Sequence, residues 1–558
     1  MKKIYLFLLL SFLCFSHSVF AQTPTWQWAQ AGAGNNSGME SRGTGIDAGG
    51  NIYAAILGLT TGGVSFGPIN LPSESMYLVK YNKHGQVKWA KAIANCRPNA
   101  LSTDAAGNSY ITGDFLDSTT IGSTTLICNG VKDIFVAKFD SSGNALWARR
   151  AGGPGFPSLP FYYSDEDVGK AIAVDTTGNC YIGGHFFISN FQTSAHNYVT
   201  FDTITYSLPA SYNNSRRFGF LAKYNAAGQI QWMRLTEWYR GFLDVAVSRQ
   251  GNLFVLGGIY DTLTFNNLPP LIIRGSVDGY YARFDPNGNP VWAKSFGSID
   301  SENMCGIAVN DQEQCYITGY FDGSTMQIGN FTLTGSLQRA TAYLAKIDNS
   351  GNVVWASQNT GSGSMGDTDI ALDSAGNAYV SAWYNGTVNI GQQAFRANTP
   401  SGSTLVSKWN NSGMPLWAVS TQGLSYVSKI AIDKNTGDGY LSGDFNKGIG
   451  FGSHYVNAPA GGFFLAKFSS NPTGISEAFS HEFSLYPNPA QNMLFLNLPE
   501  AKGIVQIELT DMQGKTVLSR NLQAGNEMKL ELSELAKGMY MLQAQTAKKV
   551  YRKKVLVE

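Results

Sequence analysis

A motif that recurs about every 60 residues constrains the fold of this chain more than any other feature. Apolar segments end at seven tryptophans, at positions 28, 89, 147, 232, 292, 355 and 417, with spacings of 61, 58, 85, 60, 63 and 62 residues. Six of them close a pattern such as FVAKFDSSGNALW, which ends at Trp147. An apolar segment, a tight turn with Asp or Asn and Gly, and a second apolar segment predict a β-hairpin.

A second motif, such as TDAAGNSYITG from Thr103, precedes each of these hairpins and occurs seven times. It also predicts a strand, a turn and a strand, so each repeat supplies four strands. Seven radial four-stranded sheets form a seven-bladed β-propeller, which we expect over residues 22–470. Two repeats depart from the pattern: the fourth has Ser248 in place of the Asp, and the fifth loses the Gly at Gln314.

The last repeat ends at Phe468 with no tryptophan after it. We expect the segment from Trp26 to Ala29 to supply its missing fourth strand. One blade would then contain both ends of the repeat region, and the ring would close without an open edge. The repeats resemble the SBBP-type β-propeller repeats of bacterial surface proteins, which share a D-x-x-G-N-x-Y-x-x-G run. The resemblance covers residues 24–470 and implies a fold more than a function.

The chain begins with a basic Met1-Lys2-Lys3 and an apolar run from Ile4 to Phe15. With a small residue at Ala21, this pattern predicts a signal peptide at residues 1–21. No later apolar stretch approaches the ~18–20 residues that a membrane helix needs. Five cysteines follow residue 21, an odd number without zinc-site spacing, so we expect small buried thiols rather than a disulfide framework.

A polar linker at residues 471–482 separates the repeats from a tail at residues 483–558, where seven short alternating segments predict a small Ig-like β-sandwich. The tail resembles the type A C-terminal sorting domain of the type IX secretion system of Bacteroidota. That resemblance implies export through the periplasm, contact with the secretion machinery, removal of the tail, and attachment to the surface or release. The matching residues are Tyr486, Pro487, Asn488, Pro489, Asp511 to Lys515, Gly538, Tyr540, Lys553 and Lys554.

Charge and motifs restrict the possible functions. Lys and Arg number 40 against 39 Asp and Glu, which gives no basic footprint for nucleic acid. Neither metalloprotease nor nucleophile-elbow spacing occurs. The Asp that opens each D-x-x-G-N turn is explained by turn chemistry, because its side chain accepts backbone N–H groups. Calcium is the alternative for these turns, although one carboxylate falls short of the six to eight oxygens that it takes.

A second acidic group lies just before the expected innermost strands. If those strands line the channel, the carboxylates gather near one mouth and favour a cation, with calcium as the possible cofactor. The alternative is that they are solvated charges at strand ends. The residues of this expected metal site are Asp165, Asp167, Glu302, Asp367 and Asp369.

The third repeat carries two long insertions, Ala151 to Asp167 and Phe186 to Arg217, which we expect on the face of variable loops. Aromatic rings beside carboxylates suit carbohydrate or peptide surfaces. The alternative is that the long loops cover each other. The expected binding residues are Tyr162, Tyr163, His196, Trp238 and Tyr239.

These features together predict a secreted or surface-exposed protein that binds or adheres without catalysis, with a glycan or a protein as ligand. A carbohydrate-active lyase or hydrolase that uses the channel mouth is the first alternative. A structural component of a surface assembly is the second.

Overall fold

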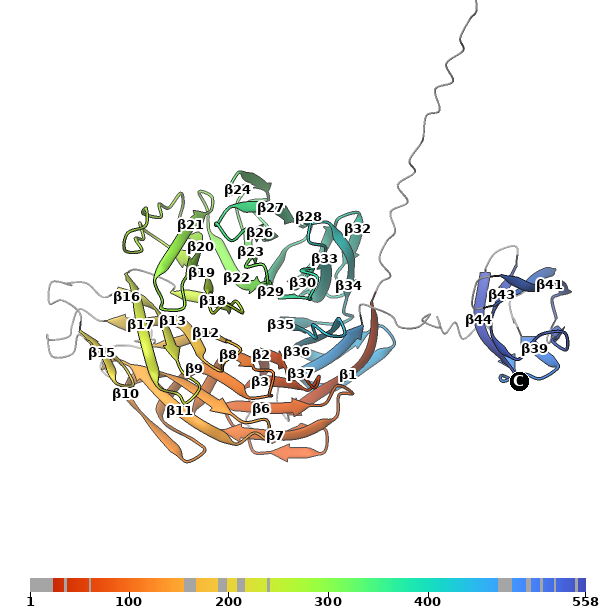
Figure 1. Cartoon of the computed structure of the whole chain (residues 1–558), viewed down its shortest axis with the longest axis horizontal. Coiled ribbons are helices and arrows are strands. Elements are labelled where there is room, and N and C mark those ends of the chain that lie inside the picture. Colours follow the sequence, from red (N-terminus) through yellow and green to blue (C-terminus); the bar gives the residue numbers. More distant parts are fainter. Residues whose placement is uncertain are drawn as a thin grey trace, which may run out of the picture. The chain divides into compact units, whose positions relative to one another are not determined.

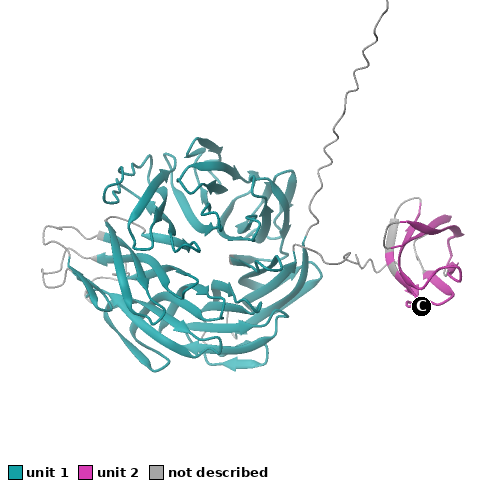
Figure 2. Ribbon diagram, viewed as in Figure 1, with its two compact units in different colours: residues 1–471 teal, residues 472–558 magenta. Residues whose placement is uncertain are grey.

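The computed structural model describes residues 24–34, 38–59, 62–154, 167–188, 198–207, 216–237, 241–469, 484–497, 503–511, 515–525, 528–546 and 550–558. The chain forms two compact units, residues 1–471 and residues 472–558 (Figure 2). The first unit contains the repeats, and the second contains the tail.

The described part of the first unit contains seven antiparallel sheets that each include four consecutive strands of a repeat, five of them four-stranded and two extended to six strands by an inserted hairpin. This arrangement is consistent with propeller blades, and we number the four-strand groups as blades 1–7. Blades 1–3 are β2 (Met39–Ile46), β3 (Ile52–Gly58), β6 (Met76–Tyr81) and β7 (Val87–Ile93); β8 (Cys96–Thr103), β9 (Ser109–Ile121), β10 (Thr124–Phe139) and β11 (Ala145–Gly152); and β12 (Val168–Val174), β13 (Cys180–Ile188), β16 (Arg216–Tyr224) and β17 (Ile230–Glu237).

Blades 4–7 follow the same order. They are β18 (Phe242–Val247), β19 (Leu253–Ile259), β20 (Asp278–Phe284) and β21 (Pro290–Phe296); β22 (Glu302–Val309), β23 (Cys315–Phe321), β26 (Thr341–Ile347) and β27 (Val353–Gln358); β29 (Met365–Leu372), β30 (Ala378–Tyr384), β33 (Ser403–Trp409) and β34 (Pro415–Ser420); and β35 (Ser425–Ile432), β36 (Asp438–Phe451), β37 (His454–Ser469) and β1 (Thr25–Gly34).

The first strand of each blade faces the centre of the ring. Each contacts the first strand of the next blade, from β2 through β8, β12, β18, β22 and β29 to β35, and β35 contacts β2 (Figure 1). The turns within the two hairpins of a blade therefore lie on one face, which we call the turn face. The connections between second and third strands and between blades lie on the opposite face, which we call the loop face.

The ring closes through the first strand of the chain, as the sequence predicts. Strand β1 pairs antiparallel with β37, with Ala29 opposite Ala466 and Trp26 opposite Phe468. The Trp26 ring lies edge-on to Phe451 and Phe468, with centroid distances of 5.0 and 5.5 Å. Blade 7 is therefore built from both ends of the repeat region.

Six of the seven repeat tryptophans join neighbouring blades on the turn face in the described residues. Trp89 donates its Nε1–H to the carbonyl of Ser141 at 3.1 Å, and Trp147 does the same to Ala226 at 3.1 Å. A Cβ added at Gly143, whose φ is 80°, would lie 3.1 Å from the Trp89 ring, so the indole needs a glycine in that turn. These tryptophans therefore pack between neighbouring blades.

On the loop face, hairpins inserted between second and third strands reach back to the preceding blade. Hairpin β14 (Tyr198–Phe201) and β15 (Ile204–Ser207) extends blade 2 through β11. Part of the long third-repeat insertion is therefore sheet rather than a free loop. The other inserted strands are β4 (Val64–Phe66), β5 (Ile69–Leu71), β24 (Thr325–Ile328), β25 (Phe331–Thr334), β31 (Thr387–Ile390) and β32 (Gln393–Arg396). Strand β31 also pairs with β28 (Thr360–Gly361).

The core of the first unit lies between blades, because each sheet buries apolar side chains against its neighbour. Tyr53 and Leu78 of blade 1, for example, share a cluster with Ile111 and Phe135 of blade 2. The five cysteines of the described residues are all free, as expected.

The second unit has two sheets, as predicted for a small sandwich. One contains β38 (Ser484–Tyr486), β39 (Met493–Asn497) and β42 (Met528–Glu531). The other contains β40 (Ile504–Thr510), β41 (Thr516–Gln523), β43 (Gly538–Gln545) and β44 (Val550–Val557). Their shared core includes Leu494, Ile507, Leu542 and Val555.

Candidate functional site: paired carboxylates between blades

The expected aromatic binding residues, Tyr162, Tyr163, His196, Trp238 and Tyr239, lie outside the described residues, as does Asp165. Their proposed role stays a prediction.

The other expected metal ligands lie on three different first strands or just before them. Asp167 precedes β12, Glu302 begins β22, and Asp367 and Asp369 belong to β29. Within the described ranges, no three His, Cys, Asp or Glu side chains are positioned together to hold a metal. Asp167, Glu302 and the segment with Asp367 and Asp369 thus belong to three different blades, and the expected metal site, which also includes Asp165, stays a prediction.

The repeated turn aspartates are fully occupied by their own turns. Asp47 Oδ1 accepts the backbone N–H groups of Gly49 and Asn51, both at 2.9 Å. Its Oδ2 accepts the side-chain amide of Asn51 at 2.8 Å and the hydroxyl of Tyr53 at 3.0 Å. This set of contacts confirms the turn interpretation.

The two departures from the repeat turn out to form one feature between blades 4 and 5. The glycine position of the fifth repeat is Glu313, with φ of 58°, and not Gln314 as the sequence indicated. Its Oε1 accepts the Ser248 hydroxyl at 2.8 Å and the Asn252 amide at 2.5 Å, and its Oε2 accepts Arg283 Nη2 at 2.7 Å. Glu313 therefore supplies to blade 4 the carboxylate that Ser248 lacks.

Charged groups also connect the first strands along the channel. Asp369 Oδ1 lies 3.6 Å from Lys429 Nζ, and its Oδ2 accepts the backbone N–H of Ile430 in the next blade at 2.8 Å. Likewise, Asp244 Oδ2 of blade 4 accepts the backbone N–H of Ile307 of blade 5 at 2.8 Å. Burial raises the pKa of Asp244 to about 7, and the Asp369 carboxylate raises the pKa of Lys429.

Asp244 and Lys429 were not among the residues that we expected from the sequence. A signal was present, because both lie four residues before the residue that opens the first turn, as Asp369 does. Their contacts hold adjacent blades together, so the role of these charged side chains is structural.

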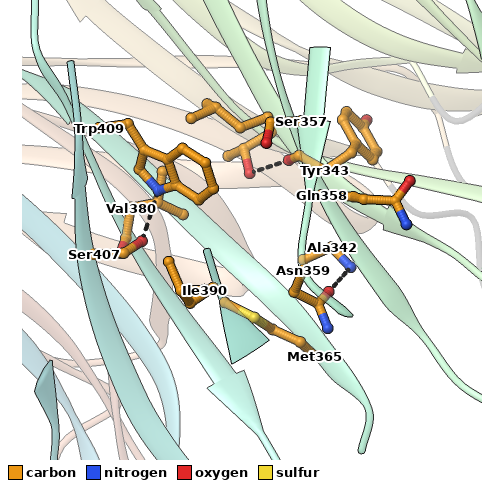
Figure 3. A pocket seen from close by; sticks show the side chains of 12 residues that line it. Ala342, Tyr343, Ser357, Gln358, Asn359, Met365, Val380, Ile390, Ser407 and Trp409 are labelled. Atoms are coloured by element: carbon orange, nitrogen blue, oxygen red, sulfur yellow. Dashed lines mark hydrogen bonds between the residues drawn. The ribbon is translucent and has the colours of Figure 1, made fainter. Parts of the chain in front are cut away.

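A groove and a small cavity of the described residues have linings that do not indicate a particular ligand. A groove of about 450 Å³ on the turn face lies between the first turns of blades 2 and 3, beside Asp104, Asp175 and Lys138. These residue types recur in other blades, and Lys138 already lies over the Tyr110 ring at 4.9 Å. A cavity of about 20 Å³ between blades 5 and 6, lined by Tyr343, Trp409 and neighbours (Figure 3), has room for about one water.

The distinctive feature is a pair of buried carboxylates at two blade junctions, each pair placed around a glycine. Between blades 2 and 3, Asp133 Oδ1 and Asp167 Oδ2 lie 2.4 and 3.0 Å from the position that a Cβ on Gly152 would take. Arg150 Nη1 bonds to Asp133 Oδ2 at 2.7 Å. Burial nevertheless raises the pKa of Asp133.

The second pair joins blades 4 and 5. Asp278 Oδ1 and Glu302 Oε2 lie 2.8 and 2.7 Å from the Cβ position of Gly297, and both residues are 0% exposed. Asp278 accepts the backbone N–H groups of Arg274 and Gly275, and Glu302 Oε1 accepts the Ser298 hydroxyl at 2.6 Å. Burial, with a smaller effect of Asp278, raises the pKa of Glu302 to about 7.

Asp133 and Asp278, the third-strand members of these pairs, escaped the sequence analysis. The usable signal is an aspartate seven residues before the turn aspartate of the second hairpin, Asp140 in one case and Asp285 in the other.

The sorting residues of the tail occupy defined positions. Tyr486 stacks on Phe495 with a centroid distance of 5.8 Å, and the bonds preceding Pro487 and Pro489 are cis. Asn488 Oδ1 accepts the backbone N–H of Leu556 at 2.9 Å, which ties the Tyr486–Pro489 segment to the last strand. Gly538 opens β43, Tyr540 is buried in it, and Lys553 and Lys554 lie in β44.

Comparison with known families identifies the tail. Residues 484–558 match the family described as "Secretion system C-terminal sorting domain". The chain therefore carries a type IX sorting domain, which implies interaction with that machinery, and it is secreted across the outer membrane to the surface or the medium. Among the described residues, no helix has the length and apolarity needed to cross a membrane.

The repeat region is similar to an uncharacterized WD repeat-containing protein, L264, of Acanthamoeba polyphaga mimivirus. The two are 23% identical over 453 residues, which cover 65% of this chain and 30% of that protein. The chain thus spans less than a third of that relative, and the similarity supports propeller-like repeats.

The chain is also similar to solved structures, two of which follow. One is a protein of unknown function from Dyadobacter fermentans DSM 18053, at 9% identity and TM-score 0.37, covering 80% of this chain and 99% of the other. The second is a glycoside hydrolase family 32 protein from Bifidobacterium adolescentis, at 9% identity and TM-score 0.22, covering 96% and 94%. At these TM-scores neither likeness bears on function.

Proposed function

We propose that the chain is an exported, non-enzymatic binding protein: a closed seven-bladed β-propeller, brought to the cell surface or the medium by its sorting domain, that recognises a glycan or protein on its loop face. The observation that carries the proposal is the set of exposed apolar side chains in the connections of that face. Those of the described residues are Leu59, Tyr260, Ile272, Ile299 and Leu337, with exposures from 43% to 78%.

Exposed apolar side chains in connections on a rigid ring are typical of binding surfaces. We expect Tyr162, Tyr163 and Trp238, which follow β11 and β17 in the sequence, to belong to connections of the same face. They would add flat rings suited to stacking on sugars or peptides.

The carboxylate pairs favour binding over glycoside chemistry. A glycosidase needs two carboxyl groups that flank the substrate bond. Asp133, Asp278 and Glu302 are each 0% exposed, and the turn aspartates are held by their own turns. A substrate would therefore reach the three buried carboxylates only by opening a blade junction, and the turn aspartates already accept the hydrogen bonds of their own turns.

The test is a glycan and peptide array probed with the secreted chain, followed by the triple variant Tyr162→Ala, Tyr163→Ala, Trp238→Ala. We expect binding to fall at least tenfold while the melting temperature changes by no more than a few degrees. The matched control replaces three exposed apolar residues of the fourth strands, Leu146, Val291 and Val354, by Ala. This control should bind as the parent does.

Unchanged affinity of the triple variant would place the site elsewhere and refute the loop-face assignment. Turnover of an array sugar would support the carbohydrate-active enzyme instead. Stable self-association, or a fixed partner recovered from cell envelopes, would support a structural component.

A further inference from the structure

The two carboxylate pairs differ in how their negative charge is balanced. The two pairs occupy equivalent positions in their blades. Asp133 and Gly152 lie one residue beyond the paired residues Ile134 and Ala151 in blade 2, and Asp278 and Gly297 lie one residue beyond Gly279 and Phe296 in blade 4. In each pair, one oxygen next to the glycine has no hydrogen-bond partner: Asp133 Oδ1 in the first and Glu302 Oε2 in the second. Both of these oxygens are buried, and both point at the space that the absent Cβ leaves.

The junction between blades 2 and 3 carries its own cation. Arg150, on β11, lies opposite Phe135 and reaches Asp133 Oδ2 at 2.7 Å. The equivalent residue of blade 4, opposite Tyr280, is Ser295. A serine therefore stands where the first junction has a guanidinium.

The surroundings of the second pair add further negative charge. Asp300 contributes to the raised pKa of Glu302, and it also raises the pKa of Asp322, after burial. Among the described residues, Arg274 forms an ion pair with this pair of carboxylates: its Nη1 lies 3.5 Å from Asp278 Oδ2, and its side chain is 45% exposed. An exposed arginine is screened by solvent, so its charge compensates less than that of Arg150, whose side chain is 22% exposed.

Two buried carboxylates need compensating positive charge, which the ion pair of Arg274 supplies to Asp278 but not to Glu302 Oε2. Two backbone hydrogen bonds connect the loops around them: the N–H of Glu302 donates to the carbonyl of Val277 at 3.0 Å, and the N–H of Ser276 donates to the carbonyl of Asp300 at 3.1 Å. Main-chain groups of residues 276, 277, 300 and 302 therefore lie close to the pair, and main-chain carbonyl oxygens are ligands that suit a hard cation.

We propose that the junction between blades 4 and 5 is a calcium site, with Asp278 Oδ1 and Glu302 Oε2 as its carboxylate ligands and main-chain oxygens and water completing the shell. The ion does there what Arg150 does between blades 2 and 3: it joins the blades on the loop face. This site is independent of the proposed ligand-binding function. Extracellular calcium modules bind with dissociation constants of about 10⁻⁴–10⁻³ M, and we expect this range.

The experiment uses the full secreted chain, freed of metal with EGTA and titrated with CaCl₂ by calorimetry and by thermal melting. We expect one saturable site and a melting temperature that rises with calcium. Glu302→Gln, which keeps the shape and removes the charge, should weaken calcium binding at least tenfold. Asp133→Asn is the matched control, because its junction is served by Arg150, and its calcium response should equal that of the parent.

A second variant keeps the proposal falsifiable if Glu302→Gln folds poorly. Ser295→Arg places at this junction the guanidinium that blade 2 has, so the chain should melt in EGTA as the parent does with calcium and should lose its calcium response. The proposal is overturned if the parent shows no calcium heat, if Glu302→Gln responds as the parent does, or if magnesium binds and calcium does not. A rise in melting temperature on acidification, with none from calcium, would show a shared proton instead and would also overturn it.

Discussion

The exchange of residues between blades 4 and 5 gives a sharp test of how the blades are joined. Glu313 sits where the repeat has a left-handed glycine, and its carboxylate serves Ser248, Asn252 and Arg283 of blade 4. The decisive changes are Ser248→Asp and Glu313→Gly, made singly and together, because the double change restores the common repeat sequence at both positions.

The magnitudes follow from the contacts. Glu313→Gly removes a carboxylate that accepts three hydrogen bonds, a loss of about 3 kcal/mol, and relieves about 1 kcal/mol of left-handed backbone cost, so the net loss is about 2 kcal/mol. Ser248→Asp alone places a second carboxylate beside Glu313 and costs at least about 1 kcal/mol. The double variant regains an acceptor for Asn252 and Arg283 without repulsion, and we expect its stability within about 1 kcal/mol of the parent.

Thermal unfolding of the four proteins measures this coupling. With an unfolding entropy of ~2.1 cal/mol/K per residue over several hundred residues, a loss of 2 kcal/mol lowers the melting temperature by about 2 °C. Glu313→Gln is a control that keeps the backbone conformation and removes the charge, and it should lose most of what Glu313→Gly loses. Additive single effects, with the double variant the least stable of all, would refute the compensation.

Three further predictions concern closure, pH and export. Deleting residues 22–30 removes Trp26 and Trp28 from blade 7 and should cost at least about 3 kcal/mol, seen as a much lower melting temperature or aggregation; an unchanged melting curve would contradict closure through β1. Burial, followed by the effect of Glu40, raises the pKa of Asp444 to about 7. Because the folded state then holds this proton more tightly than the unfolded state, the stability of the fold should decrease as the pH rises from about 4 to 7 and stay constant above. Asp444→Asn should reduce this pH dependence in melting curves, and an identical dependence in the variant would contradict the prediction. Intact-mass measurement of the secreted protein should show an N-terminus at Gln22 and the loss of roughly residues 475–558, and a secreted form that keeps its tail would contradict the second part.

The sequence was sufficient wherever structure depends on neighbours along the chain. The D-x-x-G-N turns could be predicted because Asp47 bonds to residues two, four and six positions away. The closing strand could be predicted because the last repeat lacks a tryptophan segment that the N-terminus has. The long third-repeat insertion was harder, since hairpin β14–β15 completes its pairing on blade 2 through β11.

The carboxylate pairs could not be predicted from the sequence because each pair depends on the strand register within one blade and on the placement of the next blade against it. In blade 4, the pairing of β20 with β21 places Gly297 next to Asp278, at the start of β20. In blade 5, the start of β22 places Glu302 beside the same glycine, so the two carboxylates meet there. Either residue read alone is a charge at a strand end, which is usually solvated. The repeat nevertheless supplies an internal comparison. One junction has Arg150 on its Asp133, the other has Ser295 at the equivalent position and only the more exposed Arg274 on its Asp278, and this difference is why we propose a calcium ion at the second junction.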